Sequence, residues 1–398
     1  MPESTTYKQV IPNNQNTMQG KLVYPYSDEL LNYEFNKTHP LKPDRLRLTR
    51  NLSERLGLLD LTENIRPTVP TREELEIFHD PEYVDAVEAC KDGTCRNVRY
   101  GLGIADNPTF PGLYEAARRY VGATLDGMRA IMAGASKAFV ISGGLHHAQR
   151  SEASGFCIFN DIVISIMHLL KEHECRVLYF DFDAHHGDGV QNAFYRSKDV
   201  LTISIHQTGR TLFPGTGNVF ENGAGEGEGY SVNIPLAVGA GNEELIRSFD
   251  EVVVPLFESY QPNLLVTQMG VDGHYMDPLA HLAYTSHGYE YVIRRVKEMA
   301  EETCDLGWLA VGGGGYHVTN VARLWTLFLS LMLGVEIPYQ IPKGFLEECE
   351  GIDYTKCPLT MRDEEETMQL YAARASIEDE LDRVLERVRE LVFPFHGL

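Results

Sequence analysis

The sequence predicts an α/β domain in which a parallel sheet is covered by helices on both faces. Short apolar segments alternate with longer amphipathic segments along most of the chain, as in repeated strand, helix, strand units. With 398 residues, 43% of them hydrophobic, the chain can bury a large core. Neither a Pro/Ser-rich linker nor a repeat of fixed period divides it, so we expect a single domain.

The individual elements follow from periodicity and from residues that favour helix ends. The first twenty residues are polar and contain Pro2 and Pro12, so a mobile arm is expected before the fold begins at Leu22. Thr71 opens a capping signature. Helices are predicted over residues 46–58, 81–87, 112–132, 161–171, 190–195, 245–260, 287–301 and 376–392. Strands are predicted over residues 138–141, 177–180, 200–205, 264–269 and 308–311.

Charge and cysteine content limit the class of protein. The net charge of −22 disfavours nucleic acid as a partner, because phosphate binding requires a basic surface. The seven cysteines are scattered, with no CxxC pair, which indicates a reducing, cytoplasmic environment. Neither a signal peptide nor a run of about 18 apolar residues is present, so no membrane partner is expected.

The run Asp181–Gly189 has the highest density of aspartate and histidine side chains in the sequence, and it follows the apolar segment Arg176–Phe180. Parallel sheets bind ligands at the carboxyl ends of their strands, where this run would lie. Side chains alternate along an extended segment, so Asp181, Asp183 and His185 can point to one side. Carboxylates and an imidazole on one side of a strand form a partial metal site. A solvated polar turn is the alternative interpretation.

Asp272 follows another predicted strand and would therefore lie at the same edge of the sheet. Together with Asp183 and His185 it would give three protein ligands and leave a fourth position open, the arrangement of catalytic zinc sites. A turn or helix-cap aspartate is the alternative for Asp272.

Two further strand ends carry unusual residues. His146 and His147 follow the strand over residues 138–141. The run Gly312–Gly315 permits a sharp turn that would hold the Tyr316 hydroxyl over the site. No Lys-Ser/Thr pair or GxGxxG spacing supports a phosphate or dinucleotide site there.

Five segments together resemble the signature segments of the zinc-dependent histone deacetylase superfamily. They occur in family order between about His39 and Trp325, and they are residues 143–148, 151–157, 181–189, 213–217 and 312–316. A match in so many segments is specific, whereas a lone GGGGY run is not. Within the superfamily the sequence is most similar to the bacterial acetoin-utilisation deacetylases, in residues 110–112, 204–210 and 272–279.

The resemblance implies the arginase/deacetylase fold, a single domain with a central eight-stranded parallel sheet flanked by helices. It divides the chain into a flexible arm over residues 1–20, a deacetylase catalytic domain over residues 21–358 and a C-terminal helical segment over residues 359–398. The amphipathic stripe of the last segment predicts packing on its own domain or at an interface with a partner.

The resemblance also assigns a role to each candidate site residue. Zinc, with Fe²⁺ as the alternative ion in vivo, would be held by Asp183, His185 and Asp272. The catalytic group would be His146 with its partner Asp181, His147 with its partner Asp188, and Tyr316. The substrate would be bound by Asp106 at the rim and by Gly155, Phe156, Phe213 and Leu279 along a narrow tunnel. Structural potassium would be bound at Asp181, Asp183, His185 and Ser204, and in a second position at Phe194, Ser197, Val200 and Tyr230.

Arg45 is assigned differently by spacing and by the resemblance. Its place at the start of a predicted helix suggests a surface arginine. The resemblance instead matches it to an arginine of an internal channel that releases acetate.

The implied reaction is metal-assisted hydrolysis of N6-acetyl-lysine in a protein or peptide, in particular an acetylated acyl-CoA synthetase, with release of acetate. His147 would accept a proton from the attacking water and return it to the leaving amine, while His146 would give electrostatic support. Acetylpolyamine hydrolysis is the second candidate. A ureohydrolase would need extra carboxylates for a second metal, and a catalytically silent scaffold would be expected to lack one of these residues. Monomer and homo-oligomer both stay open.

Overall fold

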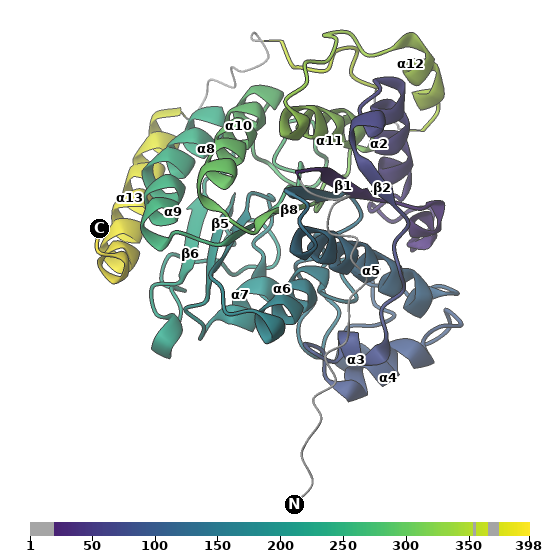
Figure 1. The fold of residues 1–398 in the computed structure, drawn as a ribbon, viewed down its shortest axis with the longest axis horizontal. Helices are drawn as coiled ribbons and strands as arrows, with labels where there is room; N and C mark the ends of the chain where they lie inside the picture. Colours follow the sequence, from purple (N-terminus) through teal and green to yellow (C-terminus); the bar gives the residue numbers. More distant parts are fainter. Residues whose placement is uncertain (1–19, 353–355, 365–373) are drawn as a thin grey trace, which may run out of the picture.

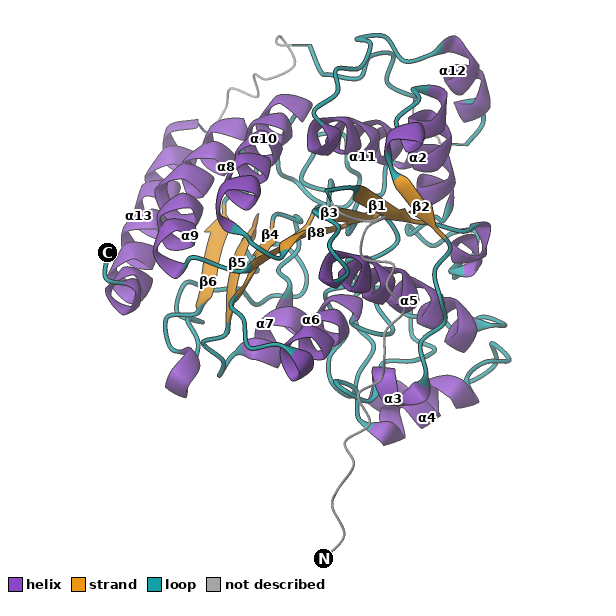
Figure 2. Ribbon diagram, in the orientation of Figure 1, coloured by secondary structure: helices purple, strands orange, loops and turns teal. Residues whose placement is uncertain are grey.

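A single parallel sheet forms the centre of the molecule (Figures 1 and 2). The computed structural model describes residues 20–352, 356–364 and 374–398. In this part of the chain the eight strands lie in the order β2-β1-β3-β8-β7-β4-β5-β6, and every neighbouring pair is parallel. The predicted parallel sheet is confirmed, and it has the strand number of the arginase/deacetylase fold.

The strands are short, and several of them are buried along their whole length. They are β1 (Leu22–Pro25), β2 (Glu63–Ile65), β3 (Lys137–Val140), β4 (Val177–Asp181), β5 (Val200–Gln207), β6 (Ser231–Leu236), β7 (Leu264–Gln268) and β8 (Gly307–Val311). All residues of β4, β5 and β7 are buried, as expected for parallel strands with a helical layer on each face.

Helices form a layer on each side of the sheet. They are α2 (Asp44–Arg55), α3 (Arg72–Leu75), α4 (Pro81–Ala89), α5 (Leu113–Met132), α6 (Asp161–Glu172), α7 (Asp188–Phe194), α8 (Asn242–Ser248), α9 (Val254–Tyr260), α10 (Ser286–Thr303), α11 (Val318–Leu333), α12 (Lys343–Cys349) and α13 (Arg374–Val392). One layer contains α5, α6 and α7, and the other contains α2, α8, α9, α10 and α11 (Figure 2).

Two predicted elements differ from the structure in an informative way. The helix predicted over residues 245–260 begins at Asn242 and contains a π-helical segment, Phe249–Val253, between α8 and α9. Pro255 explains the widened turn, because it has no N–H to continue the α-helical ladder. Strand β6 and helix α11 are not among the predicted elements, although glycines flank each of them in the sequence.

The C-terminal helix α13 packs on its own domain. It contacts β6 and α8, at the end of the sheet where β6 would otherwise be an open edge (Figure 1). Its buried stripe is Leu381, Leu385, Val388 and Val392. An edge strand that is covered in this way cannot pair with another chain.

Leu385→Ala is expected to lower the free energy of unfolding by about 2–5 kcal/mol, because it removes a buried side chain and leaves a cavity. Leu385 is 1% exposed. Chemical denaturation of the full chain measures the change, and Arg387→Ala on the solvent side of the same helix is the control. Equal stability of the two variants would contradict the packing role of α13.

Two of the cysteines are paired with each other. Cys90 and Cys95 form a disulfide across a short loop, with their Cα atoms 5.0 Å apart. A search for CxxC spacings could not reveal this pair. Cys157, Cys175 and Cys304 are free thiols.

No helix among the described residues is both long and apolar enough to cross a membrane. The predicted arm over residues 1–20 lies, apart from Gly20, outside the described residues.

Candidate active site and metal centre

The candidate site lies at the carboxyl ends of four strands that are neighbours in the sheet. Strand β3 leads to His146 and His147, β4 to Asp183, β7 to Asp272 and β8 to Tyr316. Their order is β3-β8-β7-β4, so segments far apart in the sequence meet at one edge. The predicted convergence of strand ends is therefore present.

Asp183, His185 and Asp272 form a buried group that can hold a metal ion. One ligand atom from each residue lies within 4.8 Å of the others. The His185 Nδ1 atom is 2.8 Å from Asp272 Oδ2 and 3.1 Å from Asp183 Oδ1. Among the described residues no other His, Cys, Asp and Glu side chains form such a group. Two carboxylates and one imidazole are a donor set that suits zinc or another divalent ion and leaves a position for substrate.

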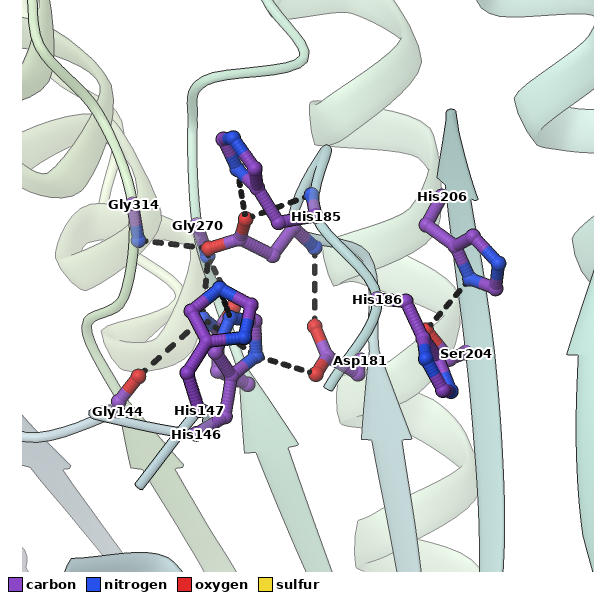
Figure 3. Close-up of polar contacts among 12 residues, drawn as sticks. Gly144, His146, His147, Asp181, His185, His186, Ser204, His206, Gly270 and Gly314 are labelled. Atoms are coloured by element: carbon purple, nitrogen blue, oxygen red, sulfur yellow. Dashed lines mark hydrogen bonds and ion pairs between the residues drawn. The ribbon is translucent and has the colours of Figure 1, made fainter. Parts of the chain in front are cut away.

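Backbone and amide donors orient the two carboxylates of this group. Asp183 Oδ2 accepts hydrogen bonds from the Gln268 side chain and from the Gly314 N–H, each at 2.7 Å (Figure 3). Asp272 Oδ1 accepts one from the Ala184 N–H at 2.8 Å. Each carboxylate thus keeps its other oxygen directed at His185. Such outer contacts commonly set metal affinity.

The backbone of the glycine run before Tyr316 lies so close to the Asp183 and Asp272 carboxylates that a side chain would not fit. A Cβ atom at Gly314 would lie 2.1 Å from Asp272 Oδ2 and 2.7 Å from Asp183 Oδ2. Any other residue would displace the carboxylates. The predicted sharp turn therefore serves the metal ligands as well as Tyr316.

Each tandem histidine is bonded to its own aspartate. His146 Nδ1 is 2.8 Å from Asp181 Oδ2, and His147 Nδ1 is 2.7 Å from Asp188 Oδ1. The Nε2 atoms of the two rings face one another at 3.0 Å. Figure 3 shows the two rings close together, below His185 in the view. The pairing expected from the resemblance is the pairing in the structure.

The environments of the two histidines push their pKa values apart. Burial alone would lower the pKa of His146, but the Asp181 and Asp183 carboxylates outweigh it and raise this pKa to about 9. Burial, reinforced by the His146 and His185 rings, lowers the pKa of His147 well below its ordinary value. These shifts favour the neutral form of His147, which can accept a proton, and the cationic form of His146. Divergent pKa values of this kind indicate separate acid and base roles.

Tyr316 is half-buried beside the metal-ligand group. Its ring centroid is 6.3 Å from that of His185 and 5.8 Å from that of Phe156. Burial and the carboxylates of Asp272 and Asp183 raise the pKa of Tyr316 well above its ordinary value, so the phenol stays a hydrogen-bond donor. Its backbone N–H donates to Asp277 Oδ2 at 2.8 Å.

Arg45 is buried, so the surface position suggested by helix spacing is wrong. Its guanidinium donates to the carbonyls of Gly313 at 2.6 Å and Gly315 at 3.4 Å. It also lies over the Trp325 ring, 5.2 Å from the ring centroid. The buried guanidinium therefore holds the backbone of the glycine run in place through these hydrogen bonds.

Three of the predicted substrate residues surround the histidines. The Phe213 ring lies 5.0 Å from the His147 ring, and Phe156 contacts Tyr316 from the other side. A Cβ atom at Gly155 would lie 2.5 Å from the His147 ring and 2.8 Å from Phe213, so only glycine fits between them. Phe156 itself has φ of 70°, a conformation that non-glycine residues rarely adopt outside functional sites.

The two remaining substrate residues lie farther out. Leu279 is half-buried, and its N–H donates to Asp277 Oδ1 at 2.9 Å. Asp106 is exposed, and its carbonyl is 3.2 Å from His39 Nε2. Its carboxylate is thus free to meet a ligand at the surface.

The residues matched to potassium positions form two groups. Asp181 and Ser204 are partners in the β4–β5 register, and Ser204 Oγ is 2.8 Å from His206 Nδ1 (Figure 3). In the second group, the Ser197 N–H donates to the Phe194 carbonyl at 2.9 Å, and Val200 begins β5. The Tyr230 carbonyl accepts from the Thr202 N–H at 3.0 Å.

Several residues that shape the site were not predicted. Gln268 contacts Asp183, and Tyr179 donates to Asp181 Oδ2 at 2.6 Å. Asp161 accepts from the N–H groups of Gly144 at 2.9 Å and Leu145 at 2.8 Å, which fixes the loop before the histidines. Gln268 ends its strand, and strand-end position was the one signal that could have found it.

Comparison with known proteins agrees with this site. Residues 39–332 match the histone deacetylase domain family. The chain is 38% identical over 344 residues to the acetoin utilization protein AcuC of Bacillus subtilis, covering 85% of this chain and 88% of that protein. It is 38% identical over 346 residues to histone deacetylase HDAC1 of Drosophila melanogaster, covering 85% of this chain and 65% of that protein. The crystal structure of an HDAC homolog from Aquifex aeolicus superposes with a TM-score of 0.82 at 29% identity, covering 92% of this chain and 100% of that one.

Fold, site and sequence together therefore define a deacetylase of the arginase/deacetylase fold, and the chain belongs to the histone deacetylase family. Within that family it lies close to the acetoin utilization proteins AcuC, as the resemblance predicted.

Proposed function

We propose that this deacetylase is zinc-dependent and hydrolyses the acetamide of N6-acetyl-lysine in proteins or peptides, with an acetylated acyl-CoA synthetase as the candidate substrate. The observation that carries the proposal is the pair His146 and His147, each bonded to its own aspartate, beside a buried Asp-His-Asp group. Similarity to acetoin utilization proteins supports the choice of an acetylated enzyme as substrate.

Asp183, His185 and Asp272 would hold the zinc ion, with Fe²⁺ as the alternative. A bound ion of this kind supplies Lewis acidity toward the substrate carbonyl and the attacking water. Two carboxylates suit a hard divalent cation, and the absence of a thiolate from this group argues against a softer ion such as Cu(I).

Side chains of the protein itself would transfer the protons and stabilise the negative charge of the reaction. His147 accepts the proton of the attacking water at Nε2, while its Nδ1–H is held by Asp188. His146, held by Asp181, donates from Nε2 toward the same region and favours negative charge there. Tyr316 donates its hydroxyl proton in a hydrogen bond to the oxyanion that forms from the carbonyl. His147 then returns the proton to the leaving amine, and acetate and the free lysine depart.

The walls near the histidines fit the stem of a lysine side chain. Phe213 presents its ring to His147 and Phe156 presents its ring to Tyr316, and aromatic rings suit a row of methylene groups. The exposed carboxylate of Asp106 would accept hydrogen bonds from a peptide backbone. The net charge of −22 favours basic peptides and disfavours nucleic acid as a partner.

Potassium is proposed as a structural ion at the two groups that include Ser204 and Tyr230. Carboxylate, hydroxyl and carbonyl oxygens are ligands that hard cations prefer. A melting temperature that is higher in KCl than in an equal concentration of choline chloride would support the potassium sites. Equal melting curves in the two salts would contradict them.

Turnover is expected to fall as the pH drops through about 6. Up to pH 9 we expect no decrease caused by ionisation of Tyr316. Burial raises the pKa of Asp188 to about 6, so below that pH the carboxylate becomes protonated and no longer stabilises the His147 Nδ1–H. The pKa of Tyr316 lies well above 10.0, so its donor proton is retained on the alkaline side. A pH profile of kcat measures both limbs, and a midpoint that does not move in Asp188→Asn would contradict the assignment.

Comparison of acetyl-lysine peptides with N-acetylspermidine tests the substrate class. We expect kcat/KM for the peptides to exceed that for the polyamine by at least about tenfold, because the backbone contact of Asp106 has no counterpart in a polyamine. Asp106→Ala should reduce kcat/KM for peptides and leave the polyamine value unchanged. Preference for acetylspermidine would instead identify an acetylpolyamine hydrolase.

A further inference from the structure

The segment that follows the family-matched residues reaches back to the active site through a buried ion pair. The family match ends at residue 332, whereas Asp363 is 7% exposed and lies against α11 and the start of α10. Asp363 Oδ1 accepts from Arg323 Nη1 at 2.9 Å, and Oδ2 accepts from the Ser286 N–H at 2.7 Å. Its own N–H donates to Ser286 Oγ at 2.8 Å. Asp363 is therefore fixed on several sides.

The second oxygen of Asp363 also bonds a residue of the metal-ligand loop. His274 Nε2 is 2.9 Å from Asp363 Oδ2, and His274 Nδ1 accepts from the Met276 N–H at 3.2 Å. Because Nδ1 is the acceptor, Nε2 carries the proton and donates it to Asp363. Arg323 Nη2 lies 3.2 Å from the same Nε2 atom. The His274 ring is thus held at both nitrogen atoms.

His274 lies in a loop that carries three parts of the site. Asp272 is a candidate metal ligand, Asp277 accepts from the Tyr316 N–H, and Leu279 is a predicted substrate contact. The Asp277 N–H donates to the His274 carbonyl at 2.8 Å, which joins the histidine directly to the residue that holds Tyr316. Movement of the His274 ring would therefore move the support of both the metal ligand and the tyrosine.

We propose that Asp363 is a positioning residue of the active site and acts through His274 on the loop from Asp272 to Leu279. The proposal rests on the proposed function for its activity readout, but its metal readout is independent of the substrate. In this view Asp363 completes the site, although it lies beyond the residues that match the family.

His274→Leu is the decisive variant, because it breaks the link while the Arg323–Asp363 ion pair stays intact. We expect the affinity for Zn²⁺, measured by competition with a chelator, and kcat on an acetyl-lysine peptide each to fall by about 10-fold or more, with a smaller change in KM. His274→Gln retains a donor toward Asp363 and should recover most of both quantities. Asp363→Asn should lower both, and the double variant with His274→Leu should show little additional loss.

Two controls separate positioning from stability. Arg362→Ala removes the neighbouring ion pair with Glu290 and should leave kcat and Zn²⁺ affinity unchanged. Asp126, on α5, accepts partly buried hydrogen bonds from Thr68. Asp126→Ala should therefore lower the melting temperature without changing kcat or Zn²⁺ affinity. All variants are compared as full chains at a temperature at which each is folded.

Wild-type Zn²⁺ affinity and kcat in His274→Leu would overturn the proposal, as would fully additive losses in the double variant. Absence of activity of the wild-type chain on acetyl-lysine peptides would overturn the proposed substrate instead. In that event the Zn²⁺ competition still decides the role of Asp363.

Discussion

Asp272→Ala is expected to remove the bound metal and to lower deacetylase turnover by more than about 1,000-fold, because a Lewis acid supplies several kcal/mol to such a reaction. Asp272 is fully buried and supplies one of only three side chains of the metal-ligand group. Two ligands cannot hold the ion in a defined geometry. The Ala184 N–H would also lose its acceptor, so the loop that carries Asp183 and His185 would lose a restraint.

Elemental analysis after dialysis and an assay of acetate release measure the two effects together. Asp272→Asn keeps the side-chain shape and the acceptor for Ala184, so it should fold like the wild type and still lose most of the metal. Asp250→Ala, which removes an exposed carboxylate bonded to Tyr291, is the control and should retain metal and activity. Metal content near one ion per chain in Asp272→Ala would contradict the proposed ligand set.

Tyr316→Phe and His147→Ala are each expected to lower turnover by about 100-fold or more while the metal stays bound. Neither side chain belongs to the metal-ligand group, so both effects are on the reaction itself. In the proposed mechanism the tyrosine hydroxyl donates a hydrogen bond to the developing oxyanion. His147 is the proposed base, and burial lowers its pKa and so favours the neutral form that can accept a proton.

Metal analysis alongside kcat and KM separates these roles from simple damage. Tyr316→Phe should change kcat more than KM, since the hydrogen bond strengthens only in the transition state. Tyr291→Phe and His396→Ala, at positions away from the site, are matched controls. Wild-type turnover in either active-site variant would refute its assigned role.

Much of the fold and the site could be predicted from the sequence because the decisive residues follow apolar strands. Asp183, His185 and Asp272 were found by their positions after strands, and the pairing of His146 with Asp181 and of His147 with Asp188 came from the resemblance. Each of these expectations agrees with the geometry in the structure.

Other residues could not be predicted because their role depends on long-range packing. Gln268 differs from other strand residues only in lying at a strand end, yet its amide contacts Asp183. For Arg45, helix spacing favours a surface position, and only the resemblance implied the internal position at which the structure buries it against the glycine run. Likewise the link between Asp363 and His274 spans 89 residues, beyond the reach of any periodicity.

The order of strands in the sheet has a consequence for how the chain folds. Strand β3 pairs with β8, so Lys137 finds its partner only when Trp308 is available. Likewise β8 and β7 lie between β3 and β4 in the sheet, and they are the last two of the described strands along the sequence. Such non-local pairing slows folding and leaves one side of β3 and one side of β4 unpaired until β7 and β8 are made. The nascent chain therefore carries Asp183 and His185 long before Asp272 and Tyr316 arrive, and metal capture with all three ligands must follow assembly of the sheet.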